Sequence, residues 1–113
     1  MNCNIVFYPL FEREAKRLAK HYPSFKEDLK TLIQELRSNP YCGVEIAHGL
    51  RKVRMAIKSK GKGKRGGARV ITMIMSINEE NPTLGLQYIY DKSSIANISD
   101  SEIRLILKNN GII

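Results

Sequence analysis

Hydrophobic and polar positions recur with changing periods along this 113-residue chain, and each period predicts an element. Residues 2–8 are rich in β-branched and aromatic side chains, and they predict a short strand that Pro9 closes. The period then becomes helical, because apolar side chains recur on one stripe while charged side chains lie mostly off it. This stripe consists of Phe11, Ala15, Leu18 and Tyr22. It predicts a first helix that ends at Pro23.

A second helix is predicted directly after Pro23. Ser24 and Glu27 have the spacing of a capping box, in which each side chain accepts the backbone N–H of the other residue. The apolar face of this helix consists of Phe25, Leu29, Leu32, Ile33 and Leu36. The pair Asn39-Pro40 stops it. Because a short Tyr-Pro-Ser turn separates the two helices, the pattern predicts an αα-hairpin.

Beyond a glycine-containing loop, the period becomes that of strands. In residues 50–58 three apolar side chains alternate with three cations. Val53, Met55 and Ile57 point to one face, and Lys52, Arg54 and Lys58 point to the other. Residues 69–77 are apolar at both parities, which is typical of a central strand. The stretch KSKGKGKRGG (58–67) between them is polar and glycine-rich, and it predicts a mobile loop.

The last two elements are a strand and a capped helix. Residues 84–91 follow an Asn81-Pro82 turn and predict a strand. Strict alternation would place four side chains on one face of it, namely Leu84, Leu86, Tyr88 and Tyr90. Ser99 and Glu102 form a second capping box, which begins a C-terminal helix that Gly111 ends. Its inward side chains are Ile103, Ile106 and Leu107.

The order β-α-α-β-β-β-α predicts a single α+β domain over residues 1–113. We expect a small antiparallel β-sheet, with the N-terminal αα-hairpin packed on one face and a C-terminal helix. The cations Lys52 and Arg54 then lie on the opposite face, which we expect to be open and not covered by helices.

Composition narrows the class of protein. The chain is 42% hydrophobic and 27% charged, which is typical of a globular domain with a core of its own. Cys3 and Cys42 lack the spacing of a disulfide framework or a metal site, so we expect reduced thiols. The sequence shows no signal-peptide pattern and no apolar run of membrane-spanning length, which predicts a cytoplasmic protein.

The charge is concentrated in one segment. Residues 51–69 carry nine Lys or Arg and no acidic residue, whereas the rest of the chain is nearly balanced. Residues 1–50 hold seven Lys or Arg against six Asp or Glu, and residues 70–113 hold three against five. The net charge of +8 therefore comes from this basic segment. Such a local field favours a phosphate backbone as the partner.

The sequence also resembles a known family. The stretches GLRKVRMAIKSKGKGKRGGARVIT (49–72) and YIYDKSS (88–94), together with the capped C-terminal helix, resemble the HigB-like branch of the RelE/ParE superfamily. Members of this superfamily are toxins of bacterial type II toxin–antitoxin systems, and GKGKRGGARVI is the most specific part of the match. The resemblance implies a ribosome-dependent mRNA interferase, an endoribonuclease that inhibits translation and is neutralised by a cognate antitoxin.

Such toxins are understood to cleave RNA without a metal or other cofactor, by attack of a ribose 2′-OH on the adjacent phosphate. The reaction needs a base, an acid and cations that stabilise the developing charge. The resemblance implies that Lys, Arg and Tyr supply these roles. The candidate catalytic residues are Arg54, Lys64, Arg69, Tyr90 and Lys92. The candidate RNA-binding residues are Lys52, Lys58, Lys60, Lys62 and Arg65.

Within the catalytic set, Arg54 and Arg69 are predicted phosphate clamps, because planar guanidinium groups bind phosphate in bidentate fashion. Lys64 and Lys92 are candidates for charge stabilisation or proton transfer, and Tyr90 for base stacking or proton donation. The chain differs from several RelE-like toxins in one respect: they carry a catalytic Tyr or His near the C-terminus, and here no aromatic residue follows Tyr90.

Two other functions stay open at this point. One is a gyrase-inhibiting toxin of the ParE type, and the other is a catalytically inactive RNA-binding module of the same fold. The toxin interpretation implies mRNA, the ribosome and an antitoxin as partners, and no membrane. Because the chain is basic, we expect the antitoxin, or a segment of it, to be acidic. The resemblance implies an antitoxin of helix-turn-helix type.

Overall fold

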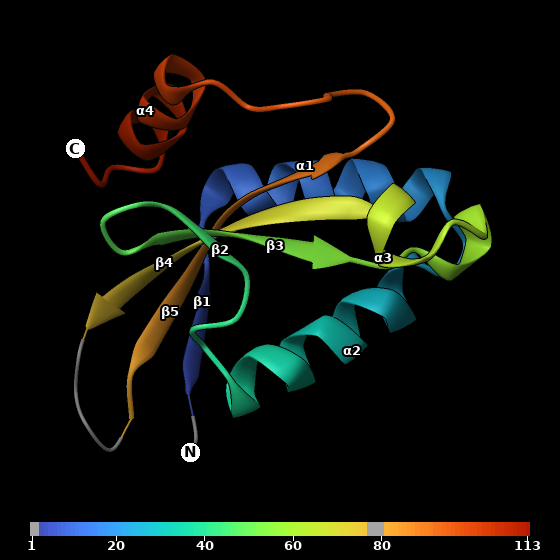
Figure 1. Cartoon of the computed structure of the whole chain (residues 1–113), viewed down its shortest axis with the longest axis horizontal. Helices are drawn as coiled ribbons and strands as arrows, with labels where there is room; N and C mark the ends of the chain where they lie inside the picture. The colour runs from blue at the N-terminus through green and yellow to red at the C-terminus, as the bar shows by residue number, and fades with distance from the viewer. Residues whose placement is uncertain (1–2, 77–80) are drawn as a thin grey trace.

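The computed structural model describes residues 3–76 and 81–113. Within them the chain folds into an α+β structure with a five-stranded mixed sheet and four α-helices (Figure 1). The elements are β1 (Asn4–Phe7), α1 (Pro9–His21), α2 (Phe25–Ser38), β2 (Val44–Ala47), β3 (Leu50–Met55), the 3-10 turn η1 (Lys58–Lys60), α3 (Gly63–Gly66), β4 (Ala68–Ser76), β5 (Thr83–Asp91) and α4 (Asp100–Asn109). Asn2 and Ile77, which the sequence predicted in strands, lie outside the described residues.

The strands are ordered β1-β5-β4-β3-β2. Strands β3, β4 and β5 form the expected antiparallel meander with β4 at the centre. Two features differ from prediction. Strand β1 pairs parallel with β5, so the sheet is mixed, because no hairpin joins these two strands and fixes their direction. Strand β2 lies where a loop was expected and forms a hairpin with β3.

The two N-terminal helices pack on one face of the sheet. Phe11 of α1 and Phe25, Leu32 and Leu36 of α2 are buried in one core cluster. The strand side chains in this cluster include Val53, Met55, Val70, Leu84, Leu86 and Ile89. The predicted apolar side of β3 is therefore confirmed, and so is the position of the helical hairpin.

The opposite face is not open. Helix α4 lies on the other side of the sheet from α2 (Figure 1), and Ile103 and Leu107 pack on Leu50, Ile71 and Tyr90. The expectation of a face without helices is therefore wrong over its centre, because these apolar strand residues need a cover of their own. The predicted capping box of α4, between Ser99 and Glu102, is present.

A β-bulge changes the parity of β5. Ile71 pairs with Tyr88 but Thr72 pairs with Leu86, so Gln87 is an extra residue on β5. As a result Tyr88 and Tyr90 belong to the core cluster under α4, whereas Leu84 and Leu86 belong to the cluster under α1 and α2. The prediction that these four side chains share one face is wrong for this reason.

Asn110 fastens the end of α4 to the bulge. Its side-chain Nδ2 donates to the Gln87 carbonyl at 2.8 Å and to Gln87 Oε1 at 3.0 Å. Its Oδ1 accepts the Leu10 N–H at 3.1 Å. One residue therefore links α4 to β5 and to the start of α1. No helix in the described part of the chain is both long and apolar enough to cross a membrane.

Candidate nucleic-acid interface

The glycine-rich stretch at residues 58–67, called the basic loop below, is held in place by α2. The Lys58 N–H donates to Asp28 Oδ2 at 3.0 Å, and the Ser59 N–H donates to Ser24 Oγ at 2.8 Å. Ser24 Oγ itself donates to Asp28 Oδ2 at 2.6 Å. The predicted capping box between Ser24 and Glu27 is therefore wrong: Ser24 makes no side-chain capping bond, because its hydroxyl binds Asp28 and the loop.

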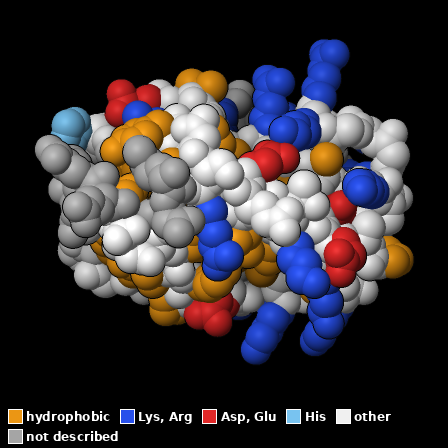
Figure 2. Space-filling view, turned by 90° about the horizontal axis from the view of Figure 1, so that it is seen from below, with side chains coloured by type: hydrophobic (Ala, Val, Ile, Leu, Met, Phe, Trp, Pro, Cys, Tyr) orange, Lys and Arg blue, Asp and Glu red, His pale blue; other side chains and the backbone are white. Residues whose placement is uncertain are grey.

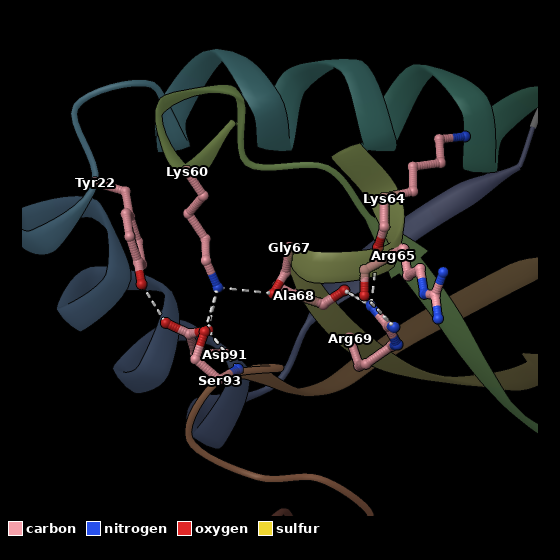
Figure 3. Close-up of polar contacts among 9 residues, drawn as sticks. All are labelled: Tyr22, Lys60, Lys64, Arg65, Gly67, Ala68, Arg69, Asp91 and Ser93. Atoms are coloured by element: carbon pink, nitrogen blue, oxygen red, sulfur yellow. Dashed lines mark hydrogen bonds and ion pairs between the residues drawn. The ribbon is translucent and has the colours of Figure 1, made fainter. Parts of the chain in front are cut away.

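A buried ion pair holds the middle of the basic loop (Figure 3). Lys60 Nζ lies 2.5 Å from Asp91 Oδ1 and also donates to Ser93 Oγ at 2.8 Å. The two side chains are 6% and 11% exposed. The Tyr22 hydroxyl donates to the second oxygen of Asp91. The loop is therefore ordered as η1 and α3, against the prediction of a mobile loop, and the Lys60 ammonium group points into the protein.

The same contacts shift two pKa values. Burial raises the pKa of Asp91, but hydrogen bonds from Lys60, Tyr22 and the Ser93 N–H outweigh it and bring the pKa to about 2. The hydrogen bond to Asp91, together with burial, raises the pKa of Tyr22 to about 12. At neutral pH Asp91 is therefore ionised, and Tyr22 keeps its proton and donates the hydrogen bond between them.

Arg69 binds the basic loop from within. Its guanidinium group donates to the carbonyl oxygens of Lys64 at 3.0 Å, Arg65 at 2.8 Å and Ala68 at 3.0 Å (Figure 3). The residue is 5% exposed, and burial together with the nearby charge of Arg54 lowers its pKa. These bonds satisfy carbonyl groups at the end of α3. In this structure the guanidinium group holds the backbone of the loop and does not face solvent.

Three predicted catalytic residues lie in one row across the sheet. Arg54 of β3 pairs with Arg69 of β4, which pairs with Tyr90 of β5. Their accessibility differs sharply. Arg54 is exposed, whereas Tyr90 is 4% exposed and lies in the cluster under α4. The Tyr90 hydroxyl is buried without a hydrogen-bond partner among the described residues. Burial raises its pKa, with Arg69 and Glu102 as smaller influences of opposite sign.

The other predicted residues lie around this row. Lys64 is exposed, and its Nζ lies 3.4 Å from Glu35 Oε2. Together with Arg54 and Lys58 it lines a small hollow of about 50 Å³ against α2. Lys92 is half-buried; its Nζ donates to the Ala96 carbonyl. The remaining predicted RNA-binding residues are the half-buried Lys52 and the exposed Lys58, Lys62 and Arg65.

The exposed cations form one region of the surface. Viewed from the α2 side, Lys and Arg side chains project mainly from the half of the molecule that carries α3, with Asp and Glu side chains among them (Figure 2). Sequence reasoning missed the acids that organise this end, Asp28 and Asp91. Their partners Lys58 and Lys60 lie 30 and 31 positions away along the chain, so no local spacing announces them.

No known protein-family model matches this chain. Within residues 3–76 and 81–113, no group of three His, Cys, Asp or Glu side chains has an arrangement that would hold a metal ion. Three features determine the chemistry of this surface. Exposed cations lie on the basic loop, the guanidinium group of Arg69 is buried beneath the loop, and the hydroxyl group of Tyr90 is buried beside it.

Proposed function

We propose that this protein is the toxin of a bacterial type II toxin–antitoxin pair, of the HigB-like branch of the RelE/ParE superfamily. It cleaves mRNA on the ribosome and thereby inhibits translation. The observation that carries the proposal is the row Arg54–Arg69–Tyr90, which runs in register across three strands beside an ordered basic loop. The resemblance of GKGKRGGARVI to this branch supports the same assignment.

In this proposal the exposed and the buried basic residues have different roles. The exposed cations would bind phosphates of the RNA backbone, and they are Arg54, Lys58, Lys62, Lys64 and Arg65. Arg69 acts as a positioning residue, because its guanidinium group fixes the carbonyl groups of α3 and so the direction of the loop. Burial raises the pKa of Tyr90, so its phenol keeps its proton at neutral pH and can donate it to the 5′-oxygen, which is a stronger base when it leaves as an alkoxide.

Tyr90 can serve in this way only after α4 has moved. Ile103 and Leu107 pack over it, and its hydroxyl is sealed from solvent. The apolar face of α4 and the hydrogen bonds of Asn110 hold the cover in place. The described structure is therefore the closed form of the proposed nuclease, and binding of RNA on the ribosome would favour an open form.

The proposed binding site of the antitoxin lies between α1 and α2, on the face of the sheet opposite α4. A hollow of about 320 Å³ lies between α1 and α2, with an apolar lining that includes Phe7, Phe11 and Phe25. Its charged lining residues are Lys16, Lys26 and Glu12. An acidic, amphipathic segment of an antitoxin would place apolar side chains in this hollow and carboxylates against the two lysines.

The deciding experiment adds the purified protein to translating ribosomes and maps the ends of the transcripts. Wild type should cleave, and Arg54→Ala should cleave about 10²-fold more slowly, because an exposed cation beside the phosphate is lost. Arg37→Ala is the matched control, since Arg37 is exposed at the end of α2. Absence of cleavage by wild type, or equal cleavage by Arg54→Ala, would reject the proposal.

A second function is favoured by one observation. The Arg69 guanidinium group is occupied by carbonyl oxygens and the Tyr90 hydroxyl is covered, which suits a module that binds RNA without cutting it. This alternative predicts RNA affinity that falls steeply with salt, by about 10³-fold or more between low and moderate ionic strength for six phosphate contacts. Binding with this salt dependence and without cleaved product would establish it.

A further inference from the structure

A large hollow lies beside the row Arg54–Arg69–Tyr90 and is lined by residues outside the basic segment 51–69. It has a volume of about 660 Å³ and is bounded by α1, by the end of β5 and by residues 94–95. This volume is within the range of about 300–1,000 Å³ that is usual for sites of small ligands. Tyr90 lines the hollow and also belongs to the row Arg54–Arg69–Tyr90, so the two regions adjoin.

Charged side chains of both signs line the hollow. Its two carboxylates are already paired, Glu14 with Arg17 and Asp91 with Lys60, and the side formed by α1 carries further basic residues. Arg17, Lys20 and His21 are spaced three and four residues apart on α1, so they lie on one face of the helix, and all three line the hollow. Arg17 is oriented by Glu14, whose Oε1 accepts from Nη1 at 2.7 Å. The Glu14 side chain is 12% exposed while that of Arg17 is 75% exposed. A buried carboxylate thus holds an exposed guanidinium group toward solvent.

The opposite wall is aromatic and apolar. Tyr88 is half-buried, and its ring centre lies 6.2 Å from that of Tyr90 at an interplanar angle of 34°. Burial raises the pKa of Tyr88, so its phenol is a neutral hydrogen-bond donor at neutral pH. Ile89 and Ile95 add apolar side chains to this wall, and Leu18 lines the hollow from α1. An aromatic wall facing the cations Arg17 and Lys20 is the arrangement that holds a base and its phosphate in single-strand binding sites.

We propose that this hollow binds one nucleotide of single-stranded RNA, with its base against Tyr88 and its phosphate at Arg17 and Lys20. The identification of the ligand as part of the mRNA substrate rests on the proposed function. A strand that contacts the exposed Arg54 and passes Tyr90 once α4 has moved enters the hollow there. The hollow would then select the base that flanks the cleavage site, through its fit against Tyr88.

The test is a titration of isotopically labelled protein with nucleoside 5′-monophosphates and with ribose 5-phosphate, followed by amide NMR spectra. The nucleotides should shift the amide signals of α1 and of the end of β5. Tyr88→Leu should weaken binding about tenfold, because base–aromatic stacking is lost, while Tyr88→Phe should keep most of the affinity. Arg17→Gln should weaken binding and its salt dependence, whereas Arg37→Gln on α2 should change neither.

Three results would overturn the inference. They are shifts confined to the basic loop, equal affinity for ribose 5-phosphate and the nucleotides, and unchanged affinity in Tyr88→Leu. Should Tyr88→Leu fail to fold, Arg17→Gln decides, because Arg17 is exposed and its replacement leaves the core intact. Nucleotide binding without cleavage on ribosomes would keep this site and reject the proposed function. Cleavage without nucleotide binding would do the reverse.

Discussion

The basic loop and α4 both lie against the sheet, but different forces hold them. The loop is fastened by polar contacts: the pair Lys60–Asp91, the carboxylate of Asp28 and the guanidinium group of Arg69. Helix α4 is held by an apolar face and by one polar residue, Asn110. Polar contacts can thus hold a glycine-rich loop, while a regular helix beside it rests mainly on apolar packing.

The largest expected effect comes from breaking the buried pair. Lys60→Met leaves the Asp91 carboxylate without its cation in a nearly buried position. The free energy of unfolding should fall by about 3–5 kcal/mol, measured by urea denaturation. The control is Lys62→Met, an exposed lysine of the same loop, for which a change within about 0.5 kcal/mol is expected. Equal losses in the two variants would mean that Lys60 is no anchor.

Next in size is the pH dependence of the same anchor. Because folding lowers the pKa of Asp91 from 3.8 to about 2, its contribution is complete above pH 4 and is lost as the pH falls toward 2. The shift corresponds to about 2 kcal/mol in the free energy of unfolding. Folding raises the pKa of Tyr22 from 10 to about 12, so that contribution is present below pH 10 and is lost between pH 10 and 12.

Urea denaturation across these two pH ranges measures both contributions. Asp91→Asn should remove the acid-side loss and, because Asp91 is the main cause of the raised Tyr22 pKa, should also reduce the alkaline-side loss. Tyr22→Phe should remove the alkaline-side loss and keep the part of the acid-side loss that comes from Lys60 and the Ser93 N–H. A Tyr22→Phe variant that loses stability above pH 10 as wild type does would contradict the assignment.

Asn110→Ala should cost about 2 kcal/mol, because the Gln87 side chain and the Leu10 N–H lose their partner in a buried place. Amide hydrogen exchange should then rise in α4 before it rises in the basic loop. The proposed nuclease should also cleave faster, since its cover opens more often. Uniformly faster exchange over the whole domain would show that α4 is not a separate unit.

A smaller effect separates the two serines that the sequence places in capping boxes. Ser99→Ala should destabilise α4 by about 1 kcal/mol, seen as faster amide exchange in that helix. Ser24→Ala should instead free residues 58–60 from α2, because its hydroxyl binds Ser59 and Asp28. The interpretation fails if Ser24→Ala loosens α2 and leaves the loop protected.

The smallest effect is expected for the exposed pair of Lys64 and Glu35. Both side chains are about half exposed, so Lys64→Gln should change the free energy of unfolding by less than about 1 kcal/mol. Its effect on RNA affinity should be larger and should diminish as salt rises, since Lys64 then acts on phosphate. A salt-independent loss of affinity would contradict this role.

Much of the fold could be predicted because local periods reflect local burial. The apolar stripe of α1, the parity of Val53 and Met55, and the central position of β4 all follow from side chains that repeat at a fixed spacing. The C-terminal capping box was also predictable, because its two members lie three residues apart.

The rest depends on contacts between distant parts of the chain. The bulge at Gln87 places Tyr88 and Tyr90 under α4, and nothing in the alternating pattern marks that residue as extra. The charge of residues 51–69 predicted an attraction to phosphate but not which cations face solvent. Lys60 and Arg69 lie among other basic residues in the sequence and look no different from them. In the structure the Lys60 ammonium group is paired with Asp91, and the Arg69 guanidinium group donates to a backbone carbonyl oxygen.

Residues 92–99 connect α4 to β5, and this short tether affects how easily another molecule can displace α4 from the sheet. A cover tethered by a short chain rebinds its own surface at an effective concentration on the order of millimolar, whatever the amount of protein present. A free molecule that competes with α4 for binding to Tyr90 and Ile71 must reach a comparable concentration before it displaces the helix. Under the proposed function, mRNA held on the ribosome would compete with α4 more effectively than a free molecule, because it too would act at a fixed local concentration.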